Sequence, residues 1–218
     1  MLELKSIKKS YLQGSQKIDI FENLTFHLDA GERVAIMGKS GSGKSTLLSL
    51  ISGIIKPDVG DISLNSISYK DLKESELNDF RATNIGFIFQ NFHLVSYLNA
   101  LENVMLPAKV CHISNPKEKA IELLKSVGLS HRLDHLPSQL SGGEKQRVAI
   151  ARALIHNPKI ILADEPSGNL DDETGNAVMD ILFELIKKNN TTLILVTHSK
   201  DVATRCEKTY ELISGNLI

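Results

Sequence analysis

Residues 38–46 read Gly-Lys-Ser-Gly-Ser-Gly-Lys-Ser-Thr and lie between an apolar run at 34–37 and a helix-like run at 47–51. A strand that enters a helix through a glycine turn directs backbone N–H groups and the positive end of the helix toward an anion. The spacing matches GxxxxGKS, the pattern of a phosphate-binding loop. A chance match has odds on the order of one in a hundred for a chain of this length. We therefore expect an α/β fold built around a polyphosphate site.

The loop residues suit different parts of a nucleotide. Gly38 and Gly43 let the main chain wrap closely around phosphate oxygens, where a side chain would block the approach. Lys44 is expected to neutralise the β- and γ-phosphates, and the Ser45 hydroxyl to ligate Mg²⁺. The loop residues expected to contact the nucleotide are Gly38, Ser40, Gly41, Ser42, Gly43, Lys44, Ser45 and Thr46.

A second apolar run, at 160–163, ends in two carboxylates, Asp164 and Glu165. This pattern is typical of a buried parallel strand whose carboxyl end reaches a ligand crevice. Asp164 is expected to hold magnesium through water, and Glu165 to polarise the attacking water. The alternative is a solvated pair of turn residues. The phosphate loop upstream favours the catalytic interpretation.

Residues 140–147 read Leu-Ser-Gly-Gly-Glu-Lys-Gln-Arg, and an apolar helical stretch follows at 148–155. A helix that begins with Ser-Gly-Gly offers free N–H groups and a hydroxyl, which makes a second anion site. Ser141 can also be a plain N-cap, with Glu144 completing a capping box. Both interpretations hold together, because a cap that leaves amides unfilled is also a phosphate site.

This combination resembles the nucleotide-binding subunit of an ATP-binding cassette (ABC) transporter. The segment beginning Leu-Ser-Gly-Gly-Glu is similar to the signature of that family, and the other family elements follow in the family's order over nearly the whole chain. By resemblance these are the Q-loop glutamine Gln90, the D-loop at 167–171 with Asp171, the switch histidine His198 and the adenine-stacking aromatic Tyr11.

The resemblance implies an α/β fold of the P-loop NTPase type, with a mixed sheet core, N-terminal antiparallel strands and an inserted helical subdomain. It implies ATP and Mg²⁺ as cofactors, with Ser45, Gln90 and Asp164 around the metal. The catalytic set would be Lys44, Gln90, Glu165 and His198.

The resemblance also implies how the subunit works with its partners. Two copies would close head to tail over two ATP molecules, so that Ser141, Gly143 and Asp171 of one copy complete the site of the other. Hydrolysis would then open the dimer and move an integral membrane permease. The subunit would be peripheral, at the cytoplasmic face of a bacterial inner membrane.

A narrower likeness rests on residues 164–171, which read Asp-Glu-Pro-Ser-Gly-Asn-Leu-Asp. This string resembles that of the group containing LolD, MacB and FtsE, and residues 98–108 and 132–137 are most similar to YbbA-like subunits. Ser167 replaces the usual threonine and keeps the hydroxyl.

The organisation expected from the sequence is a single domain with an insertion. Residues 1–90 and 158–218 would form the core, and residues 91–157 a helical subdomain. Expected strands lie at 2–11, 18–21, 24–28 and 60–64, and expected helices at 100–110 and 117–127.

Composition excludes several classes of protein. The net charge is −1 and Lys/Arg tracts are absent, which argues against nucleic acid as a partner. No apolar run approaches the ~18 residues of a membrane span, and no signal peptide is expected. Cys111 and Cys206 fit no metal or redox spacing, which favours a reduced, cytosolic compartment.

Two alternatives come from other classes of ABC protein. A soluble ABC ATPase acting on nucleic acid or the ribosome would be expected to carry a coiled-coil insertion or two fused cassettes with a basic face, which this sequence lacks. A regulatory, FtsE-like ATPase is the second alternative. A non-hydrolysing cassette is not expected, because Lys44, Asp164, Glu165 and His198 are all present.

Overall fold

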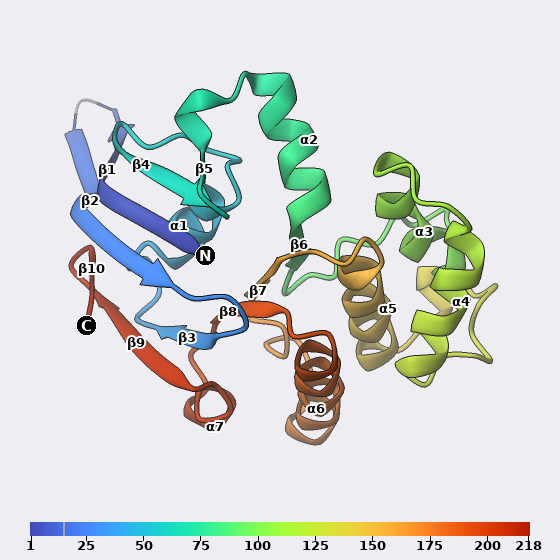
Figure 1. The fold of residues 1–218 in the computed structure, drawn as a ribbon. Coiled ribbons are helices and arrows are strands. Elements are labelled where there is room, and N and C mark those ends of the chain that lie inside the picture. The colour runs from blue at the N-terminus through green and yellow to red at the C-terminus, as the bar shows by residue number, and fades with distance from the viewer. Residues whose placement is uncertain (15) are drawn as a thin grey trace. The chain divides into compact units, whose positions relative to one another are not determined.

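The computed structural model describes residues 1–14 and 16–218. The chain forms two compact units, one of residues 1–81 and 192–218 and one of residues 82–191. Figure 1 shows their helices and strands. No helix of the described residues combines the length and the apolar character that crossing a bilayer requires.

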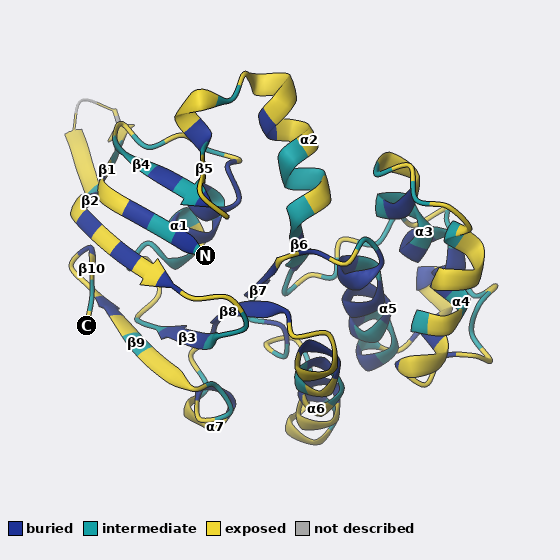
Figure 2. Cartoon of the chain, viewed as in Figure 1, coloured by how far each residue is buried: buried dark blue, intermediate teal, exposed yellow. Residues whose placement is uncertain are grey.

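The first unit contains an antiparallel sheet in the order β2-β1-β4-β5. Its strands are β1 (Leu2–Gln13), β2 (Gln16–Leu28), β4 (Val59–Leu64) and β5 (Ile67–Ser68). Buried and exposed residues alternate along the second half of β2, because one face of the sheet covers a core (Figure 2). The sequence predicted two strands where β2 is continuous. Register shifts in β1 keep β2 paired through its polar middle.

The second sheet of this unit has both parallel and antiparallel pairs. Strand β3 (Arg33–Met37) lies parallel to β8 (Thr192–Val196) and to β9 (Lys208–Ile213), and β10 (Asn216–Leu217) lies antiparallel to β9. All five residues of β8 are buried, as expected of a parallel strand covered on both faces. The predicted mixed sheet is therefore confirmed.

Helices follow the strands of the first unit. Helix α1 (Lys44–Ile51) directly continues the glycine loop after β3 and buries four apolar side chains. The 3-10 helix η1 (Tyr69–Asp71) and the short helix α7 (Lys200–Ala203) belong to the same unit. Helix α2 (Glu74–Asn84) runs across residue 81, where the units divide, and of its residues only Leu77 is buried.

The second unit has two parallel strands, β6 (Ile85–Ile88) and β7 (Ile160–Asp164), with Ile88 opposite Ala163. Gly86 of β6 lets the neighbouring helix approach the strand closely. A Cβ at this position would lie 2.4 Å from the Ala153 carbonyl oxygen, so a larger residue would not fit. The helices of this unit are α3 (Ala100–Val110), α4 (Pro116–Ser126), η2 (Pro137–Gln139), α5 (Gly142–Leu154) and α6 (Asp172–Lys188).

The start of α3 is fixed by a buried side chain that the sequence did not single out. Asn103 is fully buried, its Nδ2 donates to the carbonyls of Val95, Leu98 and Asn99, and its Oδ1 accepts from Val95 N–H. Asn99 and Glu102 form a capping box at the same end. The loop before α3 therefore has a defined conformation.

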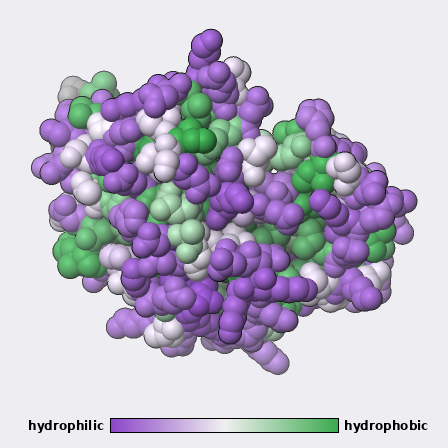
Figure 3. All heavy atoms as spheres, in the orientation of Figure 1, coloured by the Kyte–Doolittle hydropathy of each residue, from purple (hydrophilic) through white to green (hydrophobic). Residues whose placement is uncertain are grey.

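Few large apolar side chains of the described residues are exposed at the surface. The face in Figure 3 is largely hydrophilic, with apolar side chains in small groups. The most exposed large apolar side chains are Leu12 and Tyr97, each 79% exposed, and Ile218, which is 73% exposed. Scattered residues of this kind are normal on the surface of a folded protein and need no special explanation by themselves.

Candidate nucleotide site

The glycine loop has the backbone shape that its sequence predicts. Gly41 and Gly43 have φ values of 78° and 102°, which are favourable only for glycine. A Cβ at Gly43 would lie 2.7 Å from the Ile20 side chain of β2. Two requirements, the left-handed turn and the close approach of β2, therefore exclude other residues at position 43.

Lys44 reaches back over the loop. Its ammonium group donates to the carbonyl of Gly38 at 2.7 Å and to the carbonyl of Lys39 at 2.9 Å. These two bonds hold a positive charge against the backbone of the loop. A polyphosphate entering the loop thus meets a cation already held in place.

The first turn of α1 lacks a side-chain cap. Gly43 is the N-cap and offers no side-chain acceptor, and the first turn contains no acidic residue. The buried Ser42 hydroxyl has no hydrogen-bond partner among the described residues. A helix start without a side-chain cap, the unpaired Ser42 hydroxyl and a positive helix end together suit an anion.

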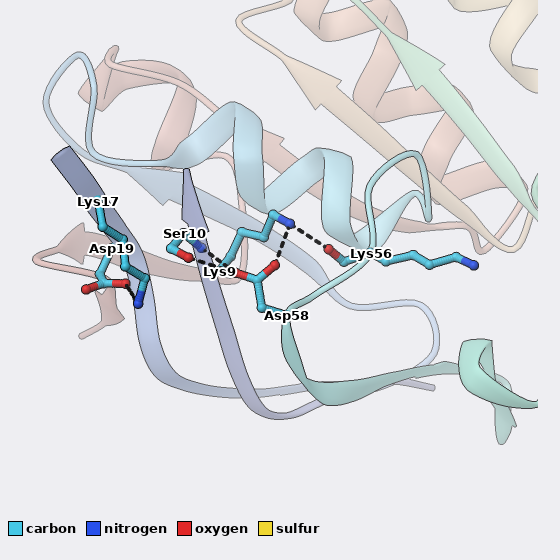
Figure 4. A network of polar contacts seen from close by, with 6 residues as sticks. All are labelled: Lys9, Ser10, Lys17, Asp19, Lys56 and Asp58. Carbon is cyan, nitrogen blue, oxygen red and sulfur yellow. Dashed lines mark hydrogen bonds and ion pairs between the residues drawn. The ribbon is translucent and has the colours of Figure 1, made fainter. Parts of the chain in front are cut away.

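Tyr11 lies on β1, paired with Ile18 of β2, and its side chain is 42% exposed. The Lys9 ammonium lies 5.5 Å from the centre of the Tyr11 ring. Figure 4 shows how Lys9 is held, by an ion pair of 2.8 Å to Asp58 and a bond of 3.0 Å to the Lys56 carbonyl. The exposed ring is therefore flat, accessible and next to a fixed cation.

Asp58 is the centre of this polar network. Its second carboxylate oxygen accepts from the Ser10 N–H at 2.7 Å and from the Ser10 hydroxyl at 3.0 Å. The pKa of Asp58 is lowered, first by the bond from Lys9 and then by that from the Ser10 N–H. The ionised carboxylate ties the turn before β4 to β1, and so fixes the strand that carries Tyr11.

The two carboxylates after the second apolar run lie in the second unit. Asp164 is the last residue of β7, and Glu165 follows it with a φ of 46°. A left-handed conformation is unfavourable for glutamate, and strain of this kind concentrates at functional sites. The turn is closed by a bond of 2.9 Å from Gly168 N–H to the Glu165 carbonyl.

Gln90 follows β6 and contacts the turn after β7 through Asn169. The Gln90 Nε2 donates to Asn169 Oδ1 at 3.1 Å, and Asn169 Nδ2 donates to the Gln90 carbonyl at 3.0 Å. The predicted Asp171 is the N-cap of α6, where its side chain accepts from Thr174 N–H at 2.9 Å. Two of the predicted loops are therefore in contact within the second unit.

The backbone after Gln90 is held by a residue of the signature helix. Phe92 and His93 both have left-handed φ values, 59° and 47°. Arg152 of α5 donates to their two carbonyls, each at 2.6 Å. Burial lowers the pKa of the Arg152 guanidinium. Charge-assisted bonds of this length hold two consecutive strained residues in place.

Ser141 is the N-cap of α5, and the expected capping box with Glu144 is present. The pKa of Glu144 is lowered, first by the Ser141 N–H bond and further by Arg132, whose Nε lies 2.8 Å from Glu144. Ser141 is exposed, whereas Gly143 is buried, and a Cβ at Gly143 would lie 2.5 Å from the Thr174 methyl carbon. Gly143 is therefore also needed for the packing of α5 on α6.

The predicted site residues fall in both units. Tyr11, the glycine loop and His198, which is exposed and follows β8, belong to the first. Gln90, Ser141, Gly143, Asp164, Glu165 and Asp171 belong to the second. Sequence reasoning missed Lys9, Arg152 and Asn169. Asn169 lies inside the D-loop string, so its position was available as a signal, but its contact to Gln90 was not.

The side chains predicted around a metal are all oxygen donors: a hydroxyl at Ser45, an amide at Gln90 and a carboxylate at Asp164. No group of three or more His, Cys, Asp or Glu side chains suited to a metal occurs in residues 1–14 and 16–218. A hydroxyl, an amide and one carboxylate suit Mg²⁺ that keeps water and phosphate ligands, and do not suit zinc. The donor set therefore fits magnesium carried in with a polyphosphate.

Known proteins resemble this chain over its whole length. The family described as ABC transporter matches residues 21–168. The lipoprotein-releasing system ATP-binding protein LolD of Legionella pneumophila (strain Paris) is 44% identical, and the match covers 100% of this chain and 96% of the relative. The uncharacterized ABC transporter ATP-binding protein YbbA of Escherichia coli (strain K12) has the same identity and coverage. The resemblance to the LolD and YbbA group is thus confirmed.

A solved structure agrees with the fold. It is the dimeric structure of a post-hydrolysis state of the ATP-binding cassette MJ0796 bound to ADP and Pi, which matches with a TM-score of 0.91 at 41% identity. The match covers 100% of this chain and 96% of that chain. The chain therefore belongs to the ABC transporter family, as an ATP-binding and ATP-hydrolysing subunit.

Proposed function

We propose that this subunit binds ATP with Mg²⁺ at the glycine loop, hydrolyses it, and uses the change to move a membrane permease. The observation that carries the proposal is the geometry of the glycine loop. Lys44 is fixed over it, the Ser42 hydroxyl lacks a partner among the described residues, and the first turn of α1 has no side-chain cap. These groups are satisfied together by one triphosphate.

The chemistry assigns a separate task to each side chain. Tyr11 stacks on the adenine, and Lys44 neutralises the β- and γ-phosphates. Magnesium, when bound, neutralises the phosphate charge, with Ser45, Gln90 and Asp164 as the residues that hold it. Glu165 accepts a proton from the attacking water, and His198 contacts the γ-phosphate and orients that water.

We further propose that ATP joins two copies head to tail. Ser141 is exposed as the N-cap of α5. In the proposed pair, the N–H groups next to it would bind the γ-phosphate of the ATP held by the glycine loop of the second copy. Gly143 and Asp171 flank this contact. The MJ0796 cassette, 41% identical, has been solved as a dimer with ADP and Pi. Loss of the bridging γ-phosphate would open the pair.

The partner we propose is an integral membrane permease at the cytoplasmic face of a bacterial inner membrane. The supporting observations are the relatives named as transporter ATP-binding proteins and the loop before α3, where Tyr97 is 79% exposed and Phe92, Leu94 and Val95 are partly exposed. Action on nucleic acid is not favoured, because the net charge is −1 and the relatives are transporter subunits.

The experiment that tests the proposal removes the loop cation. Lys44→Ala should weaken ATP binding about ten- to hundredfold, because each charge-assisted contact to phosphate contributes roughly 1.5–3 kcal/mol. Isothermal calorimetry with ATP and Mg²⁺ measures the change. Lys39→Ala is the matched control, since Lys39 is an exposed lysine of the same loop whose contact to Lys44 uses only its backbone carbonyl. Equal affinities for wild type and Lys44→Ala would refute the assignment of the loop.

A further inference from the structure

Asn169 makes an unusual set of contacts for an exposed residue. Its Nδ2 donates to the Gln90 backbone carbonyl at 3.0 Å and to Asn91 Oδ1 at 2.8 Å. Its Oδ1 accepts from Gln90 Nε2 at 3.1 Å. One asparagine side chain thus binds both the backbone and the side chain of the residue proposed to contact magnesium.

These contacts fix which way each amide faces. The Gln90 backbone carbonyl can only accept, so the atom of Asn169 that faces it must be Nδ2. Asn169 Oδ1 is then left facing Gln90, and the Gln90 atom that meets it must be the donor, Nε2. The Gln90 Oε1 is consequently directed away from Asn169.

The neighbouring backbone supports the same arrangement. Strands β6 and β7 pair with Ile88 opposite Ala163, so the loops that follow them begin side by side. A Cβ at Gly168 would lie 2.8 Å from Gln90 Nε2, so the Gln90 side chain packs against the backbone of this glycine. Leu170 N–H closes the turn onto the Ser167 carbonyl at 3.1 Å. The position of Asn169 is therefore set by a closed turn rather than by its side chain alone.

We propose that Asn169 is a positioning residue for Gln90, and that it presents Gln90 Oε1 to the magnesium of the nucleotide. The inference rests on the proposed function, because it requires Gln90 to be a magnesium ligand. An unrestrained amide presents its oxygen and its NH₂ group about equally, and only the oxygen ligates a hard cation. Without Asn169, Gln90 must be ordered by the metal itself, and metal affinity falls.

The test measures metal affinity directly. Mn²⁺ is titrated into protein saturated with an ATP analogue that has a non-hydrolysable β,γ-imido bridge, and free Mn²⁺ is read by electron paramagnetic resonance. Asn169→Ala should weaken Mn²⁺ binding roughly three- to tenfold, as expected for loss of an outer-shell partner that contributes two or three exposed hydrogen bonds. Affinity for the analogue without metal should not change, because the loop and Tyr11 are untouched.

The controls separate positioning from a general structural effect. Asn189→Ala makes the same change at an exposed asparagine that caps the other end of α6, and should bind Mn²⁺ as wild type does. Gln90→Ala should lose at least as much affinity as Asn169→Ala, and the double variant should lose no more than Gln90→Ala. Additive losses, or wild-type Mn²⁺ affinity in Asn169→Ala, would overturn the inference.

A second pair of variants covers the case in which Asn169→Ala fails to fold. Asn91→Asp keeps an oxygen that accepts from Asn169 Nδ2, whereas Asn91→Ala removes it. Mn²⁺ affinity should fall in Asn91→Ala but not in Asn91→Asp, and equal affinities would count against the inference. A wild-type chain that binds no analogue would overturn the proposed function together with this inference. Normal binding by wild type with an unaffected Asn169→Ala would overturn the inference alone.

Discussion

At the scale of single residues, the protonation of a partly buried histidine, His156, is set by one contact. His156 Nε2 lies 3.2 Å from the Ile85 carbonyl, which can only accept, so Nε2 carries the proton. His156 Nδ1 is buried and has no hydrogen-bond partner among the described residues. A second proton would therefore add a buried donor without an acceptor. Burial accordingly lowers the pKa of His156 below its ordinary value of 6.5.

This arrangement predicts a loss of stability in mild acid. Below pH 6.5 the unfolded chain binds a proton at His156 that the folded chain does not, so the free energy of unfolding falls as pH decreases toward the lowered pKa. The slope from one histidine is at most about 1.4 kcal/mol per pH unit. In urea denaturation between pH 7.5 and 5, His156→Gln should lose less stability than wild type. Parallel pH profiles for the two proteins would show that His156 titrates normally.

At the scale of elements, helix α5 serves both packing and the proposed contact to a second copy. Its N-cap is the exposed Ser141, and two residues further along the chain Gly143 is buried against Thr174 of α6. Near its other end, Arg152 holds the carbonyls of Phe92 and His93. One rigid helix thus links the signature residues to the backbone just after Gln90.

The close approach of α5 to α6 predicts a compensated pair of substitutions. Gly143→Ala should destabilise the chain by roughly 1–3 kcal/mol, because its Cβ would lie 2.5 Å from the Thr174 methyl carbon. Thr174→Ser removes that methyl and leaves the next atoms at 3.9 Å or more. The double variant should therefore recover stability, helped by the better helix propensity of alanine. Urea denaturation of all four proteins measures this, and additive losses would contradict the packing explanation.

Local sequence signals predicted some elements of this fold well and missed others. The helix expected at 100–110 is confirmed without change as α3, because Asn99 and Glu102 form a capping box that marks its start. Helix α6 was missed, although its buried residues Val178, Met179, Leu182 and Ile186 recur at helical spacing. Helix α2 gave little signal, since only Leu77 is buried. The domain boundaries at 91 and 157 stay a prediction.

The candidate site shows which features a sequence can predict and which it cannot. The glycine loop could be predicted because strand, turn, lysine and helix are contiguous, and each has a local physical reason. The bonds between Gln90 and Asn169 join residues 79 positions apart, and no local pattern encodes them. The same holds for Arg152, whose two carbonyl partners are 59 and 60 positions away. Long-range polar contacts depend on the pairing of β6 and β7, which only the structure gives.

At the scale of the whole molecule, the proposed cycle depends on removing the γ-phosphate. Glu165→Gln should keep the contacts to ATP but lower the hydrolysis rate by about 10²–10⁴-fold, the usual cost of losing a general base. The variant should then accumulate as an ATP-bound dimer. Light scattering with ATP and Mg²⁺ measures the mass, with Lys44→Ala as the control that should remain monomeric. Monomers alone, with and without the permease, would argue against the head-to-tail pair.

The glycine loop also makes nucleotide part of what keeps the chain folded. The buried Ser42 hydroxyl and the first turn of α1 have hydrogen-bonding capacity that a triphosphate satisfies. A ligand that binds only the folded form stabilises it by mass action, by about 4 kcal/mol at a thousand times its dissociation constant. Resistance to heat and to proteases should therefore follow the supply of ATP, so that an energy-starved cell loses this subunit faster than a well-fed one.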